Sequence, residues 1–223
     1  IRSRTGICSR HLAVEESLTA LAARAARQAL SEAGMEAAEL DMILAGTLSA
    51  DKLMPSLACE LQRELSSERA VAFDINAACS GFIFALQTAD AYIKSGQYGK
   101  ILVVGGEILS KLMDWNDRST CVLFGDGAGA AVVRADGEFG ILGSVQGSDG
   151  ARGEVLMCED RKNNNPYVSN TKDLSYVSMD GQEVYKFAVR TVPEAILKAT
   201  ERAGISVDEV DLFILHQANI RIL

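Results

Sequence analysis

Cys79 is the residue of this chain whose setting could make it a nucleophile. It follows an apolar segment at residues 70–75 that has the composition of a buried strand, and it opens the apolar helical segment 80–86. A thiol at a helix N-terminus faces unpaired N–H groups and the positive end of the helix dipole, which favours the thiolate. A free cysteine is also a common small core residue, so position alone leaves a packing role open. The remaining cysteines lack this strand-to-helix setting (Cys8, Cys59, Cys121 and Cys158).

His216 is the second residue that could do chemistry. It follows a predicted strand at residues 211–215, and open α/β sheets bind their ligands at the carboxyl ends of strands. A single histidine at a strand end can equally be structural, but together with a helix-opening cysteine it predicts a nucleophilic site. Five cysteines without a CxxC pair and only two histidines give no zinc-ligand pattern, so we expect no metal site.

The elements that would position these residues alternate along the chain. Residues 15–33 show the apolar spacing of a helix that Gly34 ends. The chain then alternates predicted strands with predicted helices (strands 40–48, 70–75 and 101–104; helices 55–65 and 78–94). This order predicts an α/β fold with a mostly parallel sheet covered on both faces.

Less regular segments follow this alternation. The glycines at 125, 127 and 129 predict a tight turn between strand-like residues 121–124 and 130–134, and residues 140–145 also have the composition of a strand. The glycine spacing fits neither a dinucleotide-binding loop nor a P-loop. Residues 181–203 predict a long helix that Pro193 breaks or kinks.

An internal repeat is visible at a shift of 170 residues, where residues 33–44 match residues 203–214 without a gap. Any helix, glycine cap and strand would look partly alike, but a duplication predicts two similar halves related by a pseudo-twofold axis. We therefore assign residues 1–140 to a first half that carries Cys79 and residues 141–223 to an incomplete second half that carries His216. Because the chain stops 12 residues after Asp211, we expect it to be part of a longer protein.

Composition excludes several classes of protein. With 48% hydrophobic residues the chain is too apolar to be disordered, and a net charge of −8 argues against a general nucleic-acid binder. Uncharged stretches are too short and too polar to cross a bilayer, and no secretory leader is recognisable, so we expect no membrane association. The scattered cysteines suggest a reducing compartment, the cytoplasm.

Five motifs in series resemble the β-ketoacyl-acyl-carrier-protein synthase III family. They lie at residues 4–7 (RTGI), 76–82 (NAACSGF), 117–118 (DR), 124–130 (FGDGAGA) and 216–221 (HQANIR), in the order in which the family has them. The resemblance extends over the whole chain. It implies a thiolase-like layered αβαβα fold built from two duplicated halves, and it favours the catalytic interpretation of Cys79 and His216.

The resemblance also implies a reaction, the first condensation of type II fatty-acid synthesis. Cys79 would take the acyl group of a short acyl-CoA as a thioester and release CoA. Malonyl-acyl-carrier protein would then lose carbon dioxide, with neutral His216 donating a hydrogen bond to the enolate oxygen. Acyl-CoA is a substrate here, so no cofactor is implied.

Other residues take roles only through this resemblance. Arg4 and Arg118 would flank the CoA nucleotide, and Arg221 would present positive charge to the acidic carrier protein. Met54 stands where the family often places a phenylalanine from the neighbouring subunit at the base of the acyl pocket, which implies a homodimer, and we expect a small straight primer such as acetyl. The family's second donor, an asparagine in an HGN motif, is absent from the 223 residues. We therefore expect this chain alone to be inactive.

Three alternatives stay open. A related thiolase-fold enzyme making a polyketide, quinolone or hydroxymethylglutaryl product would use the same Cys79 and His216. A Cys-His hydrolase would lose its acyl group to water. A non-catalytic interaction module would use neither residue.

Overall fold

The computed structural model describes residues 1–138, 140–168 and 175–223. The chain divides into two compact units. We call Ile1–Arg10, Leu109–Phe124 and Val145–Leu223 the terminal unit, and His11–Ile108 with Gly125–Ser144 the sheet unit. The boundary near residue 140 between two duplicated halves stays a prediction.

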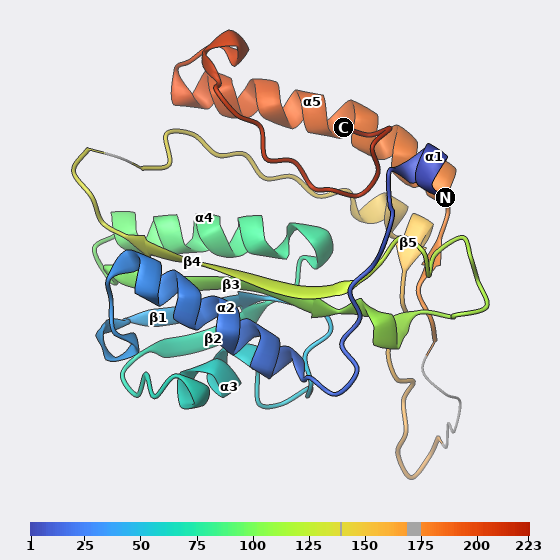
Figure 1. Ribbon diagram of the computed structural model, residues 1–223, viewed down its shortest axis with the longest axis horizontal. Helices are drawn as coiled ribbons and strands as arrows, with labels where there is room; N and C mark the ends of the chain where they lie inside the picture. The colour runs from blue at the N-terminus through green and yellow to red at the C-terminus, as the bar shows by residue number, and fades with distance from the viewer. Residues whose placement is uncertain (139, 169–174) are drawn as a thin grey trace. The chain divides into compact units, whose positions relative to one another are not determined.

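A four-stranded sheet organises the sheet unit (Figure 1). Its strands lie in the order β2-β1-β3-β4, with bounds Met42–Gly46 for β1, Val71–Ile75 for β2, Lys100–Ile108 for β3 and Asp126–Arg134 for β4. Strand β1 pairs in parallel with both β2 and β3, whereas β4 runs antiparallel to β3. The prediction of a mostly parallel sheet is therefore confirmed.

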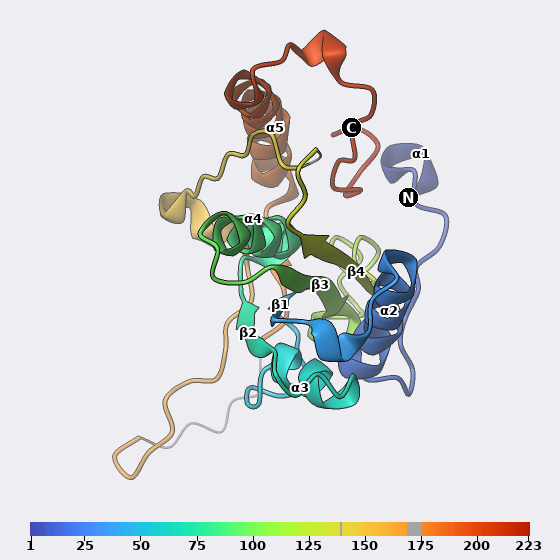
Figure 2. The ribbon, with the colours of Figure 1, turned by 90° about the vertical axis from the view of Figure 1, so that its left-hand side faces the viewer.

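Helices cover both faces of this sheet (Figure 2). Helices α2 (Leu18–Ala33) and α3 (Leu57–Glu64) pack on one face, where they bury alternate strand residues such as Ile43 and Leu102. Helix α4 (Gly81–Lys94) packs on the other face over Leu44 and Val103. Because each face is covered, all five residues of β1 are buried, which explains its unbroken apolar run.

Carboxylates fix where the helices begin. The predicted helix 15–33 starts at Leu18, because the Ser17 hydroxyl caps it and the Asp51 carboxylate accepts hydrogen bonds from its first two amides, 2.9 Å each. The predicted helix 55–65 starts at Leu57, where Asp74 accepts from the first two amides at 2.8 Å each. A negative charge at a helix N-terminus is stabilising, so Asp51, within the segment between β1 and α3, and Asp74, on β2, each stabilise the start of one helix.

The internal repeat is visible as repeated local geometry. Helix α2 ends on Gly34 (φ 61°), and the long helix α5 (Gly181–Ala203) ends on Gly204 (φ 72°). Both ends have the same glycine-capped hydrogen-bond pattern, and each is followed by a short 3₁₀ helix that closes a capping box (Ala37–Glu39 and Val207–Glu209). The bounds predicted for the helix 181–203 are confirmed, with Pro193 inside it.

Residues 211–215 depart from the repeat, because they do not form the predicted strand. Strand β1, the corresponding segment of the first copy, is hydrogen-bonded on both sides by β2 and β3. Within the described residues no strand pairs with residues 211–215, and Leu212 and Ile214 are 72% and 89% exposed. A strand requires a ladder partner, and without one the segment is irregular.

The glycine-rich segment also differs from its prediction. Gly127 and Gly129 do not form a turn but lie inside β4, opposite Glu107 and Gly105 of β3. The antiparallel ladder with β3 extends β4 back through the glycines, and the chain reverses over the connection between the two strands, residues 109–125, whose turn residues are 115–116 and 118–123. Residues 121–124 and 140–145 are therefore not strands.

No helix among the described residues is long and apolar enough to cross a bilayer. The terminal unit contains several short elements besides α5. They are the one-turn helix α1 (Arg2–Thr5), the 3₁₀ segments η3 (Leu109–Leu112) and η4 (Gly150–Val155), and a small hairpin-like sheet of β5 (Leu156–Met157) with β6 (Ser178–Met179).

Backbone-to-backbone contact fixes where α4 sits on the sheet. A Cβ atom on Gly46 at the end of β1 would lie 2.5 Å from the carbonyl carbon of Gly81, the first residue of α4. A Cβ atom on Gly105 of β3 would lie 3.2 Å from the Phe82 side chain. Only glycine at these positions lets the helix start approach the strands this closely.

We expect Gly46→Ala to lower the free energy of unfolding by about 2 kcal/mol or more, because the added methyl group meets backbone that cannot move away cheaply. The measurement is the urea midpoint followed by circular dichroism. Gly129→Ala is the control, since a Cβ there meets nothing within 4 Å. Equal midpoints for the two variants would contradict the packing argument.

Candidate active site

Cys79 lies at a sharp corner between a strand and a helix. Strand β2 ends at Ile75, the short 3₁₀ turn η2 (Ala78–Ser80) follows, and α4 begins at Gly81. Ala78 has a φ of 45°, in the left-handed region that residues with a side chain rarely adopt. Such strain at a non-glycine residue is typical of functional corners. The strand-to-helix setting predicted for Cys79 is confirmed, and the corner leaves the residue exposed.

The electrostatic surroundings of Cys79 do not favour its thiolate. Desolvation of the thiol raises its pKa above the ordinary value, and the negative charge of Glu107 raises the pKa further. This is the opposite of what the helix N-terminus alone predicts. The residue as a whole is exposed, but the groups packed around the sulfur remove enough water from it to disfavour the charged form. Cys79 is therefore a thiol at neutral pH and needs a proton acceptor to become a nucleophile.

Glu107 is a site residue that the sequence reasoning missed. It lies on β3 and accepts hydrogen bonds from the Leu48 amide (2.9 Å), the Thr47 hydroxyl (3.3 Å) and the Ser49 hydroxyl. Burial raises the pKa of its carboxyl group, and these hydrogen bonds oppose that rise. The signal available in the sequence was a single charge directly after two glycines in the apolar run of residues 101–108.

In the terminal unit, two of the predicted site segments lie side by side. The Ile220 amide donates to the Thr5 carbonyl oxygen at 3.1 Å, and a Cβ on Gly6 would lie 3.3 Å from the Ile220 side chain. The segment that carries Arg4 is thus joined to the segment that carries Arg221. Both arginines are exposed, as residues that recognise an anionic partner need to be.

His216 is exposed and belongs to an irregular segment rather than to a strand end. Its carbonyl oxygen accepts from the Ala218 amide at 2.9 Å, and the Asn219 side chain accepts from the Arg221 amide at 3.0 Å, so two consecutive tight turns shape the HQANIR segment. Cys79 belongs to the sheet unit and His216 to the terminal unit. Their apposition stays a prediction.

Arg118 projects from a turn that Asp117 organises. The Asp117 carboxylate accepts from the Ser119 amide (2.9 Å) and hydroxyl (2.6 Å) and from the Thr120 hydroxyl (2.8 Å), and these hydrogen bonds lower its pKa. Arg118 and its neighbour Trp115 are exposed on this turn. A nucleotide-binding role for Arg118 stays a prediction.

Met54 lies in the segment between β1 and α3, directly before a cis peptide bond to Pro55. Its side chain is 83% exposed, and that of Leu53 is 74% exposed. Two large apolar side chains in water next to each other are costly unless another surface covers them. The position of Met54 at the base of an acyl pocket stays a prediction.

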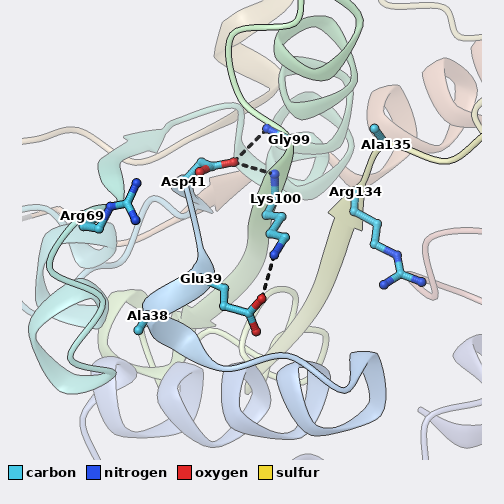
Figure 3. A pocket seen from close by; sticks show the side chains of 8 residues that line it. All are labelled: Ala38, Glu39, Asp41, Arg69, Gly99, Lys100, Arg134 and Ala135. Carbon is cyan, nitrogen blue, oxygen red and sulfur yellow. Dashed lines mark hydrogen bonds and ion pairs between the residues drawn. The ribbon is translucent and has the colours of Figure 1, made fainter.

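A shallow cavity of about 560 Å³ lies at the end of the sheet where β1 and β3 begin, opposite the strand ends that lie near Cys79 (Figure 3). The Lys100 ammonium group pairs with Glu39 at 2.7 Å, and Asp41 accepts from the Gly99 and Lys100 amides. Glu39, Asp41 and Lys100 thus form their hydrogen bonds and ion pair with other residues of the cavity wall. No cysteine, histidine or serine lines the cavity. Among the described residues no group of three or more potential metal ligands occurs.

Comparisons with known proteins agree on one family. Residues 73–150, which include Cys79 and Glu107, match the family model for 3-oxoacyl-[acyl-carrier-protein] synthase III. The chain is 45% identical over its whole length to the β-ketoacyl-[acyl-carrier-protein] synthase III of Clostridium acetobutylicum, and it spans 69% of that protein.

Solved structures give the same result. The crystal structure of the synthase III from Aquifex aeolicus aligns with a TM-score of 0.89 at 45% identity, covering 100% of this chain and 68% of that one. The priming β-ketosynthase of the R1128 polyketide pathway aligns with a TM-score of 0.90 at 37% identity, covering 99% of this chain and 66% of that one. The chain therefore has a thiolase-like fold and belongs to the β-ketoacyl-acyl-carrier-protein synthase III family, the condensing enzymes of fatty-acid synthesis.

Proposed function

We propose that Cys79 is the nucleophile of a priming condensation in which a short acyl-CoA is the first substrate and malonyl-acyl-carrier protein the second. The observation that carries this proposal is the strained corner at Ala78, which presents Cys79 between strand β2 and helix α4. A nucleophile at such a corner is accessible to a substrate while its backbone stays fixed. The corner also lies within the residues that match the family model.

The first step is an acyl transfer. The Cys79 sulfur attacks the carbonyl carbon of the acyl thioester, a new C–S bond forms, and CoA leaves as a thiolate. Since the surroundings of Cys79 raise its pKa, its proton has to be removed as the attack occurs. Neutral His216 has one ring nitrogen free to accept this proton and can pass it to the departing CoA thiolate.

The second step makes the new carbon–carbon bond. The malonyl group loses carbon dioxide, and the resulting enolate attacks the carbonyl carbon of acyl-Cys79, which releases the Cys79 thiolate and a β-ketoacyl thioester. His216 stabilises the enolate oxygen through its N–H group. The 223 residues contain no HGN motif, so a second donor is lacking and we expect the chain by itself to have little condensing activity.

The terminal unit supplies the surfaces that would bind the two large substrates. Its exposed arginines at positions 4, 118 and 221 present positive charge, although the whole chain has a net charge of −8. A local cationic surface attracts a phosphorylated or acidic partner even when the total charge is negative. We assign Arg4 and Arg118 to the CoA nucleotide and Arg221 to the carrier protein.

Two further observations support the assembly and the location that we propose. The exposed side chains of Leu53 and Met54 support a homodimer in which Met54 closes the acyl pocket of the neighbouring subunit. All five cysteines are free, which supports the reducing cytoplasm as the compartment. No cofactor takes part in the proposed reaction.

A polyketide-priming enzyme is the second candidate function. The likeness to the R1128 priming β-ketosynthase favours it, because that protein shares the fold over 99% of this chain. Cys79 and His216 would act identically in both enzymes, so only the identity of the accepted primer and carrier protein separates them.

We expect acetyl-CoA to add one acetyl group to Cys79 of the full-length protein, because a thioester is stable until the second substrate arrives. Intact-protein mass spectrometry measures the adduct. Cys79→Ala should abolish it, whereas Cys59→Ala should not, since that thiol is half-buried in α3 with its hydrogen directed at the Ala72 carbonyl oxygen. An adduct that forms on Cys79→Ala would refute the assignment, and rapid loss of acetate to water would favour a hydrolase.

Primer choice is a separate expectation. We expect acetyl-CoA to be used with a higher kcat/KM than isobutyryl-CoA or hexanoyl-CoA, and steady-state assays with malonyl-acyl-carrier protein measure the three values. A branched or long primer that wins by more than about tenfold, well beyond the effect of one methylene group in an apolar pocket, would overturn a small acyl pocket.

Arg221→Glu should raise the KM for malonyl-acyl-carrier protein by about fivefold in the full-length enzyme, because reversing one charge at the edge of an interface weakens association. The increase should shrink at high salt. Acetyl transfer to Cys79 should not change. Arg161→Glu, an equal charge reversal on an exposed loop, is the control, and an equal rise in its KM would show that only total charge matters.

A further inference from the structure

We propose that Glu107 is a positioning residue for Cys79. Its carboxylate ties the turn that leaves β1 to the end of β3, beneath the corner that carries Cys79, and it directs a negative charge at the sulfur. The inference rests on the proposed role of Cys79 as the nucleophile and adds a residue that controls when this nucleophile is reactive.

The register of the sheet places Glu107 on the face that α4 covers. Alternate residues of β3 point to the same face, and Gly105 lies beneath Phe82 of α4, so Glu107 points to that face one step further along the strand. The next residue, Ile108, packs with the helices of the other face. Strand β1 ends opposite Gly105, at Gly46. Glu107 therefore lies just beyond the end of β1.

Cys79 lies over the same end of β1. Phe82 contacts Gly105, and Gly81 contacts Gly46, so the start of α4 sits on the last residues of the two strands. The chain that precedes Phe82 comes from the carboxyl end of β2, and Cys79 is three residues before Phe82. This places the sulfur near the carboxylate of Glu107, whose charge acts on it.

Three consecutive residues hold the carboxylate in place. The Thr47 hydroxyl, the Leu48 amide and the Ser49 hydroxyl all donate to its two oxygens, and the Ser49 oxygen in turn accepts from the Ile108 amide at 2.8 Å. An ionised carboxylate only accepts hydrogen bonds, so three donors favour the charged form and oppose the effect of burial, which raises the pKa of Glu107.

Among the residues that the structure describes, no cationic side chain forms an ion pair with Glu107, whose partners are Thr47, Leu48 and Ser49. Gly127 lies opposite it on β4 and has no side chain. The neighbouring Asp126 carboxylate accepts from the Ala13 amide at 2.8 Å. Across the part of the sheet unit that the structure describes, Glu107 is the charged side chain that acts on the Cys79 thiol. Because this charge disfavours the thiolate, the Cys79 thiol reacts slowly with electrophiles until a proton acceptor approaches it.

The test is the pH dependence of Cys79 alkylation by iodoacetamide in the full chain. Tryptic peptide 70–94 contains Cys79 and no other cysteine, so mass spectrometry can follow this thiol alone. Glu107→Gln removes the charge and should increase the alkylation rate at pH 7.5 by about threefold or more, since the thiolate fraction rises when a nearby negative charge is removed. The rate profile should shift toward lower pH.

Glu60→Gln is the matched control. Glu60 is a buried carboxylate of the sheet unit, whereas Glu107 is half-buried, and Glu60 pairs with Lys52 at 3.0 Å and Arg63 at 3.2 Å rather than facing Cys79. Its alkylation profile should stay that of the wild type. If Glu107→Gln behaves like this control or slows alkylation while its circular dichroism is unchanged, the proposal is wrong.

If Glu107→Gln does not fold, Ser49→Ala tests the proposal in its place. It removes the hydroxyl that joins the Glu107 carboxylate to the Ile108 amide and to the turn after β1, so the charge is no longer held toward the sulfur and Cys79 should be alkylated faster, by less than in Glu107→Gln. An unchanged or lower rate would overturn the proposal. Because alkylation needs neither acyl-CoA nor a carrier protein, its outcome is independent of whether the proposed condensation is correct.

Discussion

The close contact between Gly46 and Gly81 is the constraint on which the site depends. Because neither position has a side chain, the backbone of Gly81, the first residue of α4, contacts the backbone at the end of β1. This contact holds the corner at Cys79 close to the carboxyl ends of the strands. Any larger residue would lift the helix start and carry Cys79 away from Glu107. The same contact therefore sets both the accessibility of the sulfur and the charge that it faces.

Much of this arrangement could be predicted from the sequence. Alternating helices and strands, the glycine caps at Gly34 and Gly204 and the strand-to-helix setting of Cys79 are local patterns, and the structure confirms them. Features set by distant partners could not be predicted. The glycines of β4 are extended because β3 pairs with them, and residues 211–215 are irregular because no described strand does.

Glu107 shows the same limit within the site. A charge in an apolar strand can be noticed, but its three donors come from residues about 60 positions earlier, at the end of a different strand. The helix start at Cys79 predicted a lowered pKa, but the pKa is raised, because desolvation of the thiol and the charge of the half-buried Glu107 outweigh a helix start. Local sequence can single out a cysteine at a helix start, whereas tertiary contacts set the direction in which its pKa moves.

The unpaired segment at residues 212–215 has a consequence for handling the protein. Leu212, Phe213 and Ile214 are between 44% and 89% exposed, and the segment has no proline and no charge after Asp211. Such a stretch offers unsatisfied backbone groups and apolar side chains to identical stretches of other molecules, which is the signature of cross-β self-association. We therefore expect these residues, which lead to His216, to promote self-association of the chain, and a charged substitution among them to reduce it.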